Sequence, residues 1–71
     1  MRKVEVSKEP VELYKILKFE GMVASGGEAK SVISEGQVLV NGVVETRKRK
    51  KIVSGDIIEF AKEKIHIFAA G

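Results

Sequence analysis

The stretch GEAKSVISEGQVLVNG, residues 27–42, changes along its length from a helical to a strand-like hydrophobic period. In its first half, Ala29, Val32 and Ile33 have the i, i+3, i+4 spacing of one helix face. In its second half, the pair Asn41-Gly42 stands between two β-branched runs, which is the strongest short-range signal for a β-hairpin. The stretch therefore predicts a short helix that leads directly into a hairpin.

Both ends of this helix are marked in the sequence. Ser25 and Glu28 have the S-x-x-E spacing of a capping box, which predicts Ser25 as the N-cap residue with Glu28 reaching back to it. Gly36 lies where a C-terminal cap belongs. A helix of about ten residues does not persist in water alone, so it needs a packing partner.

An earlier helix supplies that partner. Pro10 suits the first turn of a helix, and the helical pattern continues over residues 11–20 until Gly21, a left-handed cap. The residues that fall on its apolar face are Leu13, Ile16 and Leu17. Only four residues separate the two helices, which predicts an αα-hairpin.

The rest of the chain has the pattern of short strands joined by turns. We expect turns at residues 54–56 and 61–64 and strands at residues 4–6, 57–60 and 65–68, with Phe60 and Phe68 in the core. The predicted fold class is α+β, a two-helix hairpin packed on a small, mostly antiparallel β-sheet. With 71 residues, the chain is predicted to form one domain, residues 1–71.

Composition excludes several classes of function. The sequence has no cysteine and a single histidine, His66, so we expect no catalytic residue, no metal site and no cofactor. The N-terminus lacks the apolar segment of a signal peptide, and no apolar run approaches the roughly 20 residues of a spanning helix. We therefore expect a cytoplasmic protein, a monomer, that does not bind membranes.

The positive charge of the chain is concentrated in one segment. Residues 46–51 hold five cations in six positions, whereas the remainder has eight cations against ten acids, a net of 8 − 10 = −2. We call this segment the basic run; its cations are Arg47, Lys48, Arg49, Lys50 and Lys51. Such a patch on a slightly acidic body is typical of a polyanion-binding protein, although a solvated loop without a partner would have the same composition.

The conformation of the basic run decides how many of its cations reach one ligand. In a strand, Arg47, Arg49 and Lys51 would face one way and the other two lysines the opposite way, whereas in a loop all five could reach one backbone. Arg47 and Arg49 are the leading candidates, because the planar guanidinium suits bidentate contact with phosphate. Aromatic residues are few, which favours recognition of structured RNA by backbone and shape over base stacking.

Residues 27–42, together with the turn Gly55-Asp56-Ile57-Ile58, resemble a known family. The pattern G-x-V-x-V-N-G followed by G-D-x-I is similar to that of the S-four RNA-binding domain, named after small-subunit ribosomal protein four and also called the alpha-L motif. The resemblance covers residues 11–60 and implies two packed helices on a small antiparallel sheet. It implies binding to structured RNA, ribosomal RNA foremost and transfer RNA as an alternative, as in small stand-alone bacterial members that are suspected of acting on ribosomes.

The resemblance also implies where RNA binds, namely the start and exposed face of the second helix and the hairpin. The matching positions here are Ser25, Gly26, Lys30, Gln37 and Asn41, together with the basic run. Many members carry arginine where this chain has Gly26 and Gly27. We therefore expect the basic run to supply more of the RNA contact in this chain. The two glycines have an alternative role as a flexible N-cap, and Asn41 as a turn residue. The alternative function is a protein-interaction module that docks its basic run on an acidic protein surface of the ribosome or another complex.

Overall fold

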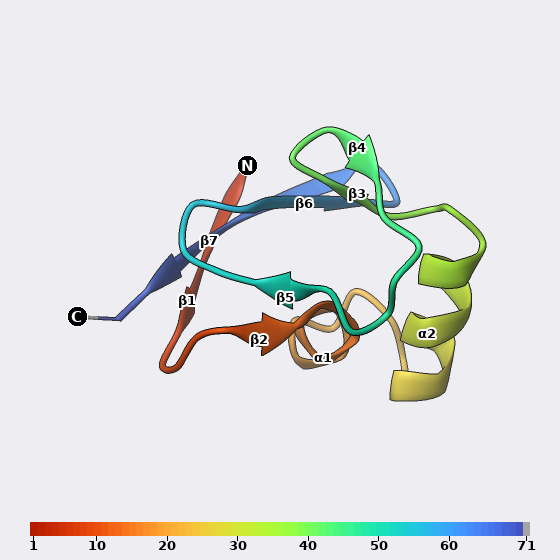
Figure 1. Cartoon of the computed structure of the whole chain (residues 1–71), viewed down its shortest axis with the longest axis horizontal. Coiled ribbons are helices and arrows are strands. Elements are labelled where there is room, and N and C mark those ends of the chain that lie inside the picture. Colours follow the sequence, from red (N-terminus) through yellow and green to blue (C-terminus); the bar gives the residue numbers. More distant parts are fainter. Residues whose placement is uncertain (71) are drawn as a thin grey trace.

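The computed structural model describes residues 1–70 and has an α+β architecture, as predicted (Figure 1). The elements are β1 (Arg2–Val6), β2 (Val11–Glu12), α1 (Leu13–Phe19), α2 (Gly26–Ser34), β3 (Leu39–Val40), β4 (Val43–Val44), β5 (Lys51–Ile52), β6 (Ile57–Phe60) and β7 (Glu63–Ala69). One sheet has the order β1-β7-β6-β3-β4, and β2 pairs with β5 in a separate ladder. Only the β1–β7 pair is parallel among the described strand pairs, so the sheet is mostly antiparallel.

The first helix begins later than predicted. Val11 and Glu12 form β2, which pairs antiparallel with β5 through Val11↔Ile52 and Glu12↔Lys51, and α1 begins only at Leu13. Pro10 therefore precedes a strand and does not occupy the first helical turn, which corrects the prediction. The end of α1 agrees with it, because Gly21 follows the helix with φ +70° in the left-handed region.

The second helix is capped as predicted at both ends, with one difference in detail. The Ser25 hydroxyl accepts a hydrogen bond from the Glu28 N–H at 3.1 Å, and Gly36 has φ +78° just beyond the C-terminus. The Glu28 carboxylate, however, accepts from the N–H of Ala24 at 2.8 Å, one residue before the N-cap. Both contacts satisfy N–H groups at the entry to the helix, so the cap retains its stabilising role.

The predicted hairpin is present, and its turn explains the sequence that forms it. Asn41 and Gly42 have φ 54° and 82°, and β3 and β4 pair directly across them. Left-handed conformations at both central positions are those of a type I′ turn, which Asn-Gly adopts readily. The turn between β6 and β7, predicted at residues 61–64, is shorter than predicted. Ala61 and Lys62 alone reverse the chain with positive φ, and β7 begins at Glu63.

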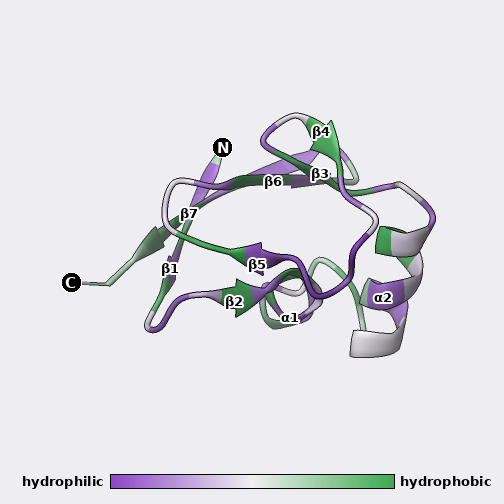
Figure 2. Ribbon diagram, viewed as in Figure 1, coloured by the Kyte–Doolittle hydropathy of each residue, from purple (hydrophilic) through white to green (hydrophobic). Residues whose placement is uncertain are grey.

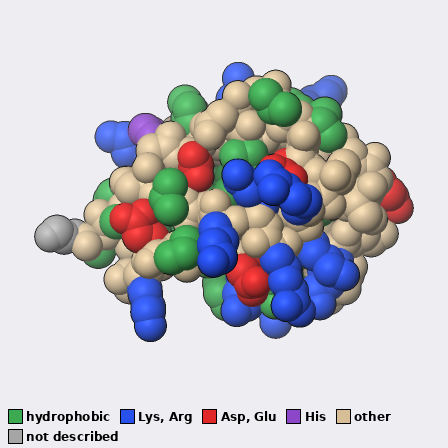
Figure 3. All heavy atoms as spheres, viewed as in Figure 1, with side chains coloured by type: hydrophobic (Ala, Val, Ile, Leu, Met, Phe, Trp, Pro, Cys, Tyr) green, Lys and Arg blue, Asp and Glu red, His purple; other side chains and the backbone are tan. Residues whose placement is uncertain are grey.

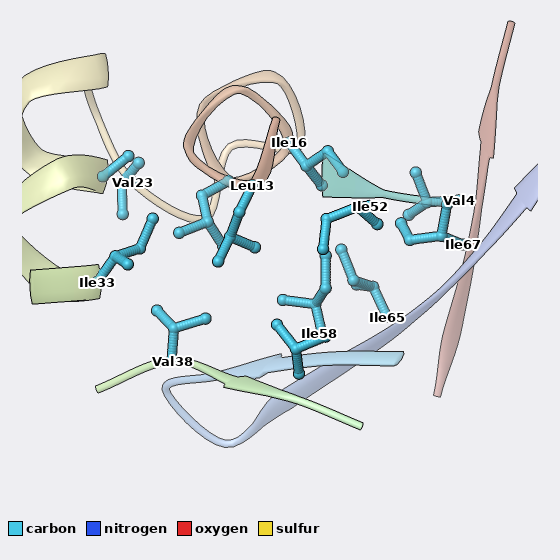
Figure 4. Packing of buried hydrophobic residues seen from close by; sticks show 13 residues of the cluster. Val4, Leu13, Ile16, Val23, Ile33, Val38, Ile52, Ile58, Ile65 and Ile67 are labelled. Carbon is cyan, nitrogen blue, oxygen red and sulfur yellow. The ribbon is translucent and has the colours of Figure 1, made fainter. Parts of the chain in front are cut away.

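The core lies between the sheet, the β2–β5 ladder and the helix pair (Figure 4). Its buried members are Val4, Leu13, Ile16, Leu17, Val23, Ala29, Ile33, Val38, Val40, Ile52, Ile58, Ile65 and Ile67. Phe68 is not among them, contrary to the prediction, because Ile65 and Ile67 point inward and strand alternation turns Phe68 outward. Phe60 packs against the core while partly buried. Neither helix within residues 1–70 is long and apolar enough to cross a membrane.

Candidate nucleic-acid interface

The basic run is a loop for most of its length. Only Lys51 belongs to a strand, β5, while the preceding residues join β4 to β5. The carbonyl of Arg47 accepts a hydrogen bond from the N–H of Lys50 at 3.1 Å, which places Lys48 and Arg49 at the corner of a reverse turn. Figure 2 shows most of this connection in the purple of hydrophilic residues. The loop interpretation therefore holds, and the alternating-strand interpretation is wrong for residues 47–50.

The start of α1 fixes this loop in place. The N–H groups of Leu13 and Tyr14 donate to the carbonyls of Lys50 and Lys48, at 2.9 and 3.1 Å. The first N–H groups of a helix have no partner within the helix, and no side chain caps α1. The basic run thus serves as the N-terminal cap of α1, and the helix in turn holds the backbone of the run against the body of the protein.

Arg47 differs from the other cations of the run because it is already paired. Its Nε lies 2.9 Å from Oε2 of Glu45 and its Nη2 lies 3.2 Å from Oε1, a bidentate contact. The backbone N–H of Arg47 also donates to Oε2, at 3.0 Å. Hydrogen bonds from the side chain and backbone of Arg47 lower the pKa of Glu45 to about 2, and the same contact raises the pKa of Arg47. The composition of the run gave no sign that one of its five cations is engaged.

The remaining cations of the run have no carboxylate partner within residues 1–70. The side chains of Lys48, Arg49 and Lys51 are exposed and that of Lys50 is half-buried. In the face shown in Figure 3, Lys and Arg side chains gather over the region where Figure 1 places β5, α1 and α2. This part of the surface is the candidate nucleic-acid interface.

Tyr14 joins the two helices to this surface. The Nζ of Lys30, on α2, lies 4.8 Å from the centroid of the Tyr14 ring. The start of α2 is also close, because a Cβ at Gly26 would lie 3.9 Å from Cδ of Lys18 and 4.0 Å from the Tyr14 ring. Since Tyr14 also donates its backbone N–H to Lys48, the basic run, Gly26 and Lys30 converge on one residue.

Sequence reasoning missed the contribution of α1 to this surface. Lys15 and Lys18 lie on the exposed face of α1, away from the buried Leu13 and Leu17, while Tyr14 lies at the border and packs partly against the core. The signal was present, because a helix that buries positions 13, 16 and 17 must turn positions 15 and 18 outward. What the sequence does not contain is the position of the basic run beside this outward face.

Three other predicted residues use their polar atoms within the fold. The Ser25 hydroxyl caps α2, and Nε2 of Gln37 donates to Oε1 of Glu35 at 2.6 Å. Asn41 accepts from the N–H of Ile57 at 2.9 Å and donates to Oδ1 of Asp56 at 3.0 Å. Gln37 follows the C-terminus of α2, at the opposite end from Gly26, and Asn41 lies at the hairpin turn. RNA contact by these residues stays a prediction.

Comparison with known proteins agrees with this geometry. The family model described as S4 domain matches residues 4–68. The Escherichia coli (strain K12) protein named "Putative RNA-binding protein YbcJ" is 49% identical over 70 residues, 97% of this chain and 100% of that protein. The solution structure of YbcJ, described as revealing an "alfaL motif involved in RNA-binding", matches with a TM-score of 0.74 at 47% identity, covering 97% of this chain and 89% of that one. The Bacillus subtilis (strain 168) protein named "Probable ribosome maturation protein RlbA" is 36% identical over 56 residues, 79% of each chain.

The chain belongs to the S4 domain family. Its fold, a helix pair on a mostly antiparallel sheet, is that of the alpha-L motif.

Proposed function

We propose that this protein is a non-catalytic module that binds structured RNA, in particular ribosomal RNA, through backbone charge and shape. The observation that carries the proposal is the basic run, whose unpaired cations sit on a loop held by the N-terminus of α1 beside the lysines of both helices. Because the backbone of this loop is anchored, less conformational freedom is lost when its cations meet a fixed set of phosphates, which favours folded RNA over a flexible strand.

The relatives support RNA as the ligand and the ribosome as its source. YbcJ is named as an RNA-binding protein, and RlbA is named for ribosome maturation. A role for this chain in ribosome assembly or function, in the cytoplasm, is consistent with both names. Transfer RNA is the alternative ligand, because it offers a similar folded backbone.

Capture from a cell lysate tests RNA against protein as the partner. The tagged protein is incubated with lysate, and half of the sample receives ribonuclease before washing. The proposal predicts that ribosomal RNA is recovered and that associated proteins are lost after ribonuclease treatment. A partner that remains bound in equal amount after ribonuclease would instead identify a protein-interaction module and contradict the proposal.

A further inference from the structure

Glu45 is an acid that lies directly before the basic run and contacts its first cation. Its backbone N–H donates to the carbonyl of Val38 at 2.9 Å, which anchors it beside the β3–β4 hairpin. Its side chain is only 13% exposed, whereas that of Arg47 is 71% exposed. The carboxylate is therefore covered by the protein and by the guanidinium, while the guanidinium faces solvent.

The contact uses one particular edge of the guanidinium. Glu45 engages Nε and Nη2 of Arg47, which are the two nitrogens of the side-on edge. An arginine side chain has five N–H donors, so both N–H groups of Nη1 and the second one of Nη2 are left over. Among the described residues, no other hydrogen bond or ion pair of this guanidinium is present. The end-on edge, which has the fork geometry that fits phosphate, therefore points away from the fixed carboxylate.

We propose that Glu45 is a positioning residue that holds Arg47 by its side-on edge, so that the end-on edge binds one phosphate of the RNA. This inference rests on the proposed RNA-binding function and assigns a role to a residue that charge alone would count against binding. The same carboxylate also holds the backbone N–H of Arg47, so it fixes where the basic run begins. Holding the guanidinium before RNA arrives reduces the conformational entropy lost on binding.

A competing interpretation predicts the opposite change in RNA affinity when the charge of Glu45 is removed. If Glu45 only neutralised Arg47, removal of its charge would free a cation and tighten RNA binding. Glu45→Gln separates the two, because it removes the charge with almost no change in shape. The matched control is Glu12→Gln, since Glu12 pairs with Lys15 at 3.3 Å and lies opposite Lys51 in the β2–β5 ladder. Both variants raise the net charge by one beside the same surface.

The experiment measures the affinity of each variant for one ribosomal RNA helix–loop fragment at a single salt concentration. We expect Glu45→Gln to weaken binding about 2- to 10-fold, the range expected when one long side chain must be ordered on binding. Glu12→Gln should bind as tightly as the wild-type protein or more tightly. In an Arg47→Ala background, Glu45→Gln should cause no further loss, because the carboxylate acts through Arg47.

Two further measurements separate positioning from a general structural effect. Arg47→Lys keeps the charge and the backbone contact but lacks the fork, and we expect it to weaken binding by a similar factor. By NMR, the Nε–H signal of Arg47 should be protected from solvent exchange in the wild-type protein and lose this protection in Glu45→Gln.

Each outcome is decisive. Tighter binding by Glu45→Gln, or an equal loss in the Arg47→Ala background, would overturn the positioning role while leaving RNA binding intact. If the wild-type protein did not bind RNA at all, the proposed function itself would fail, and the inference with it.

Discussion

Replacing Lys48, Arg49 and Lys51 together with alanine removes most of the free charge of the basic run without removing its anchors. These three side chains are exposed, and none has a carboxylate partner within residues 1–70. The contacts that hold the loop to α1 use backbone carbonyls, which alanine retains. The variant should therefore fold normally and differ from the wild-type protein chiefly in RNA binding.

The magnitude follows from the number of cations of the basic run that contact phosphate. Each phosphate contact contributes about −0.9 to the slope of log affinity against log salt concentration for a double helix. Five cations, with Arg47 contacting phosphate through its end-on edge, predict a slope of about −4.5, and the variant, which keeps Arg47 and Lys50, has a predicted slope of about −1.8. Between 50 and 200 mM salt, a fourfold change, the wild-type affinity should fall about 500-fold and that of the variant about 12-fold.

Fluorescence anisotropy with a labelled ribosomal RNA fragment measures both slopes. The matched control is the triple variant Lys3→Ala, Lys62→Ala and Lys64→Ala, which removes the same charge from exposed positions on β1, the β6–β7 turn and β7. Its slope should equal that of the wild-type protein. Equal slopes for the two triple variants would contradict a specific role of the basic run, because binding would then depend on net charge alone.

Three further predictions concern the fold that supports this surface. Ile58→Ala should lower the free energy of unfolding, measured by urea denaturation, by about 2–5 kcal/mol, because Ile58 is fully buried; a loss below about 1 kcal/mol would contradict its place in the core. Ser25→Ala should cost about 1 kcal/mol in the same assay, since the hydroxyl caps α2, and an unchanged stability would show that the cap contributes nothing. The carboxyl of Glu45 should titrate near pH 2 by NMR, and its pKa should return toward 4.5 in Arg47→Ala. Because the pKa is lower in the folded than in the unfolded state, the stability that this pair contributes is present above pH 4.5 and is lost as the pH falls toward 2. A titration midpoint near 4.5 in the wild-type protein would mean that the ion pair does not form in solution.

The parts of the fold that the sequence predicted are those fixed by neighbouring residues. The Asn41-Gly42 turn and the Ser25 cap each depend on positions within a few residues, and both are present. The β2–β5 ladder was not predicted, because Val11 pairs with Ile52, far along the chain, and this pairing replaces the first turn that Pro10 suggested. Phe68 was misassigned because its exposure depends on which face of β7 meets the core.

In the candidate site, too, local features could be predicted from the sequence and contacts between distant segments could not. The basic run was identified by composition alone, and its loop conformation was one of two alternatives. Its attachment to α1 could not be predicted, because it depends on backbone hydrogen bonds from Leu13 and Tyr14 to a distant segment. The pairing of Arg47 with Glu45 was missed because the acid lies just outside the basic run, and composition does not indicate which cation has a partner.

Crosslinking of the protein to RNA in living cells, followed by sequencing of the bound RNA, is the most direct test of whether the basic run directs the protein to ribosomal RNA. The wild-type protein and the Lys48→Ala, Arg49→Ala, Lys51→Ala variant are compared at equal abundance. If the basic run recognises folded ribosomal RNA, a defined region of that RNA will be enriched with the wild-type protein and lost with the variant. Equal and unselective profiles for the two proteins would contradict this expectation, because the basic run would then not direct the protein to folded RNA.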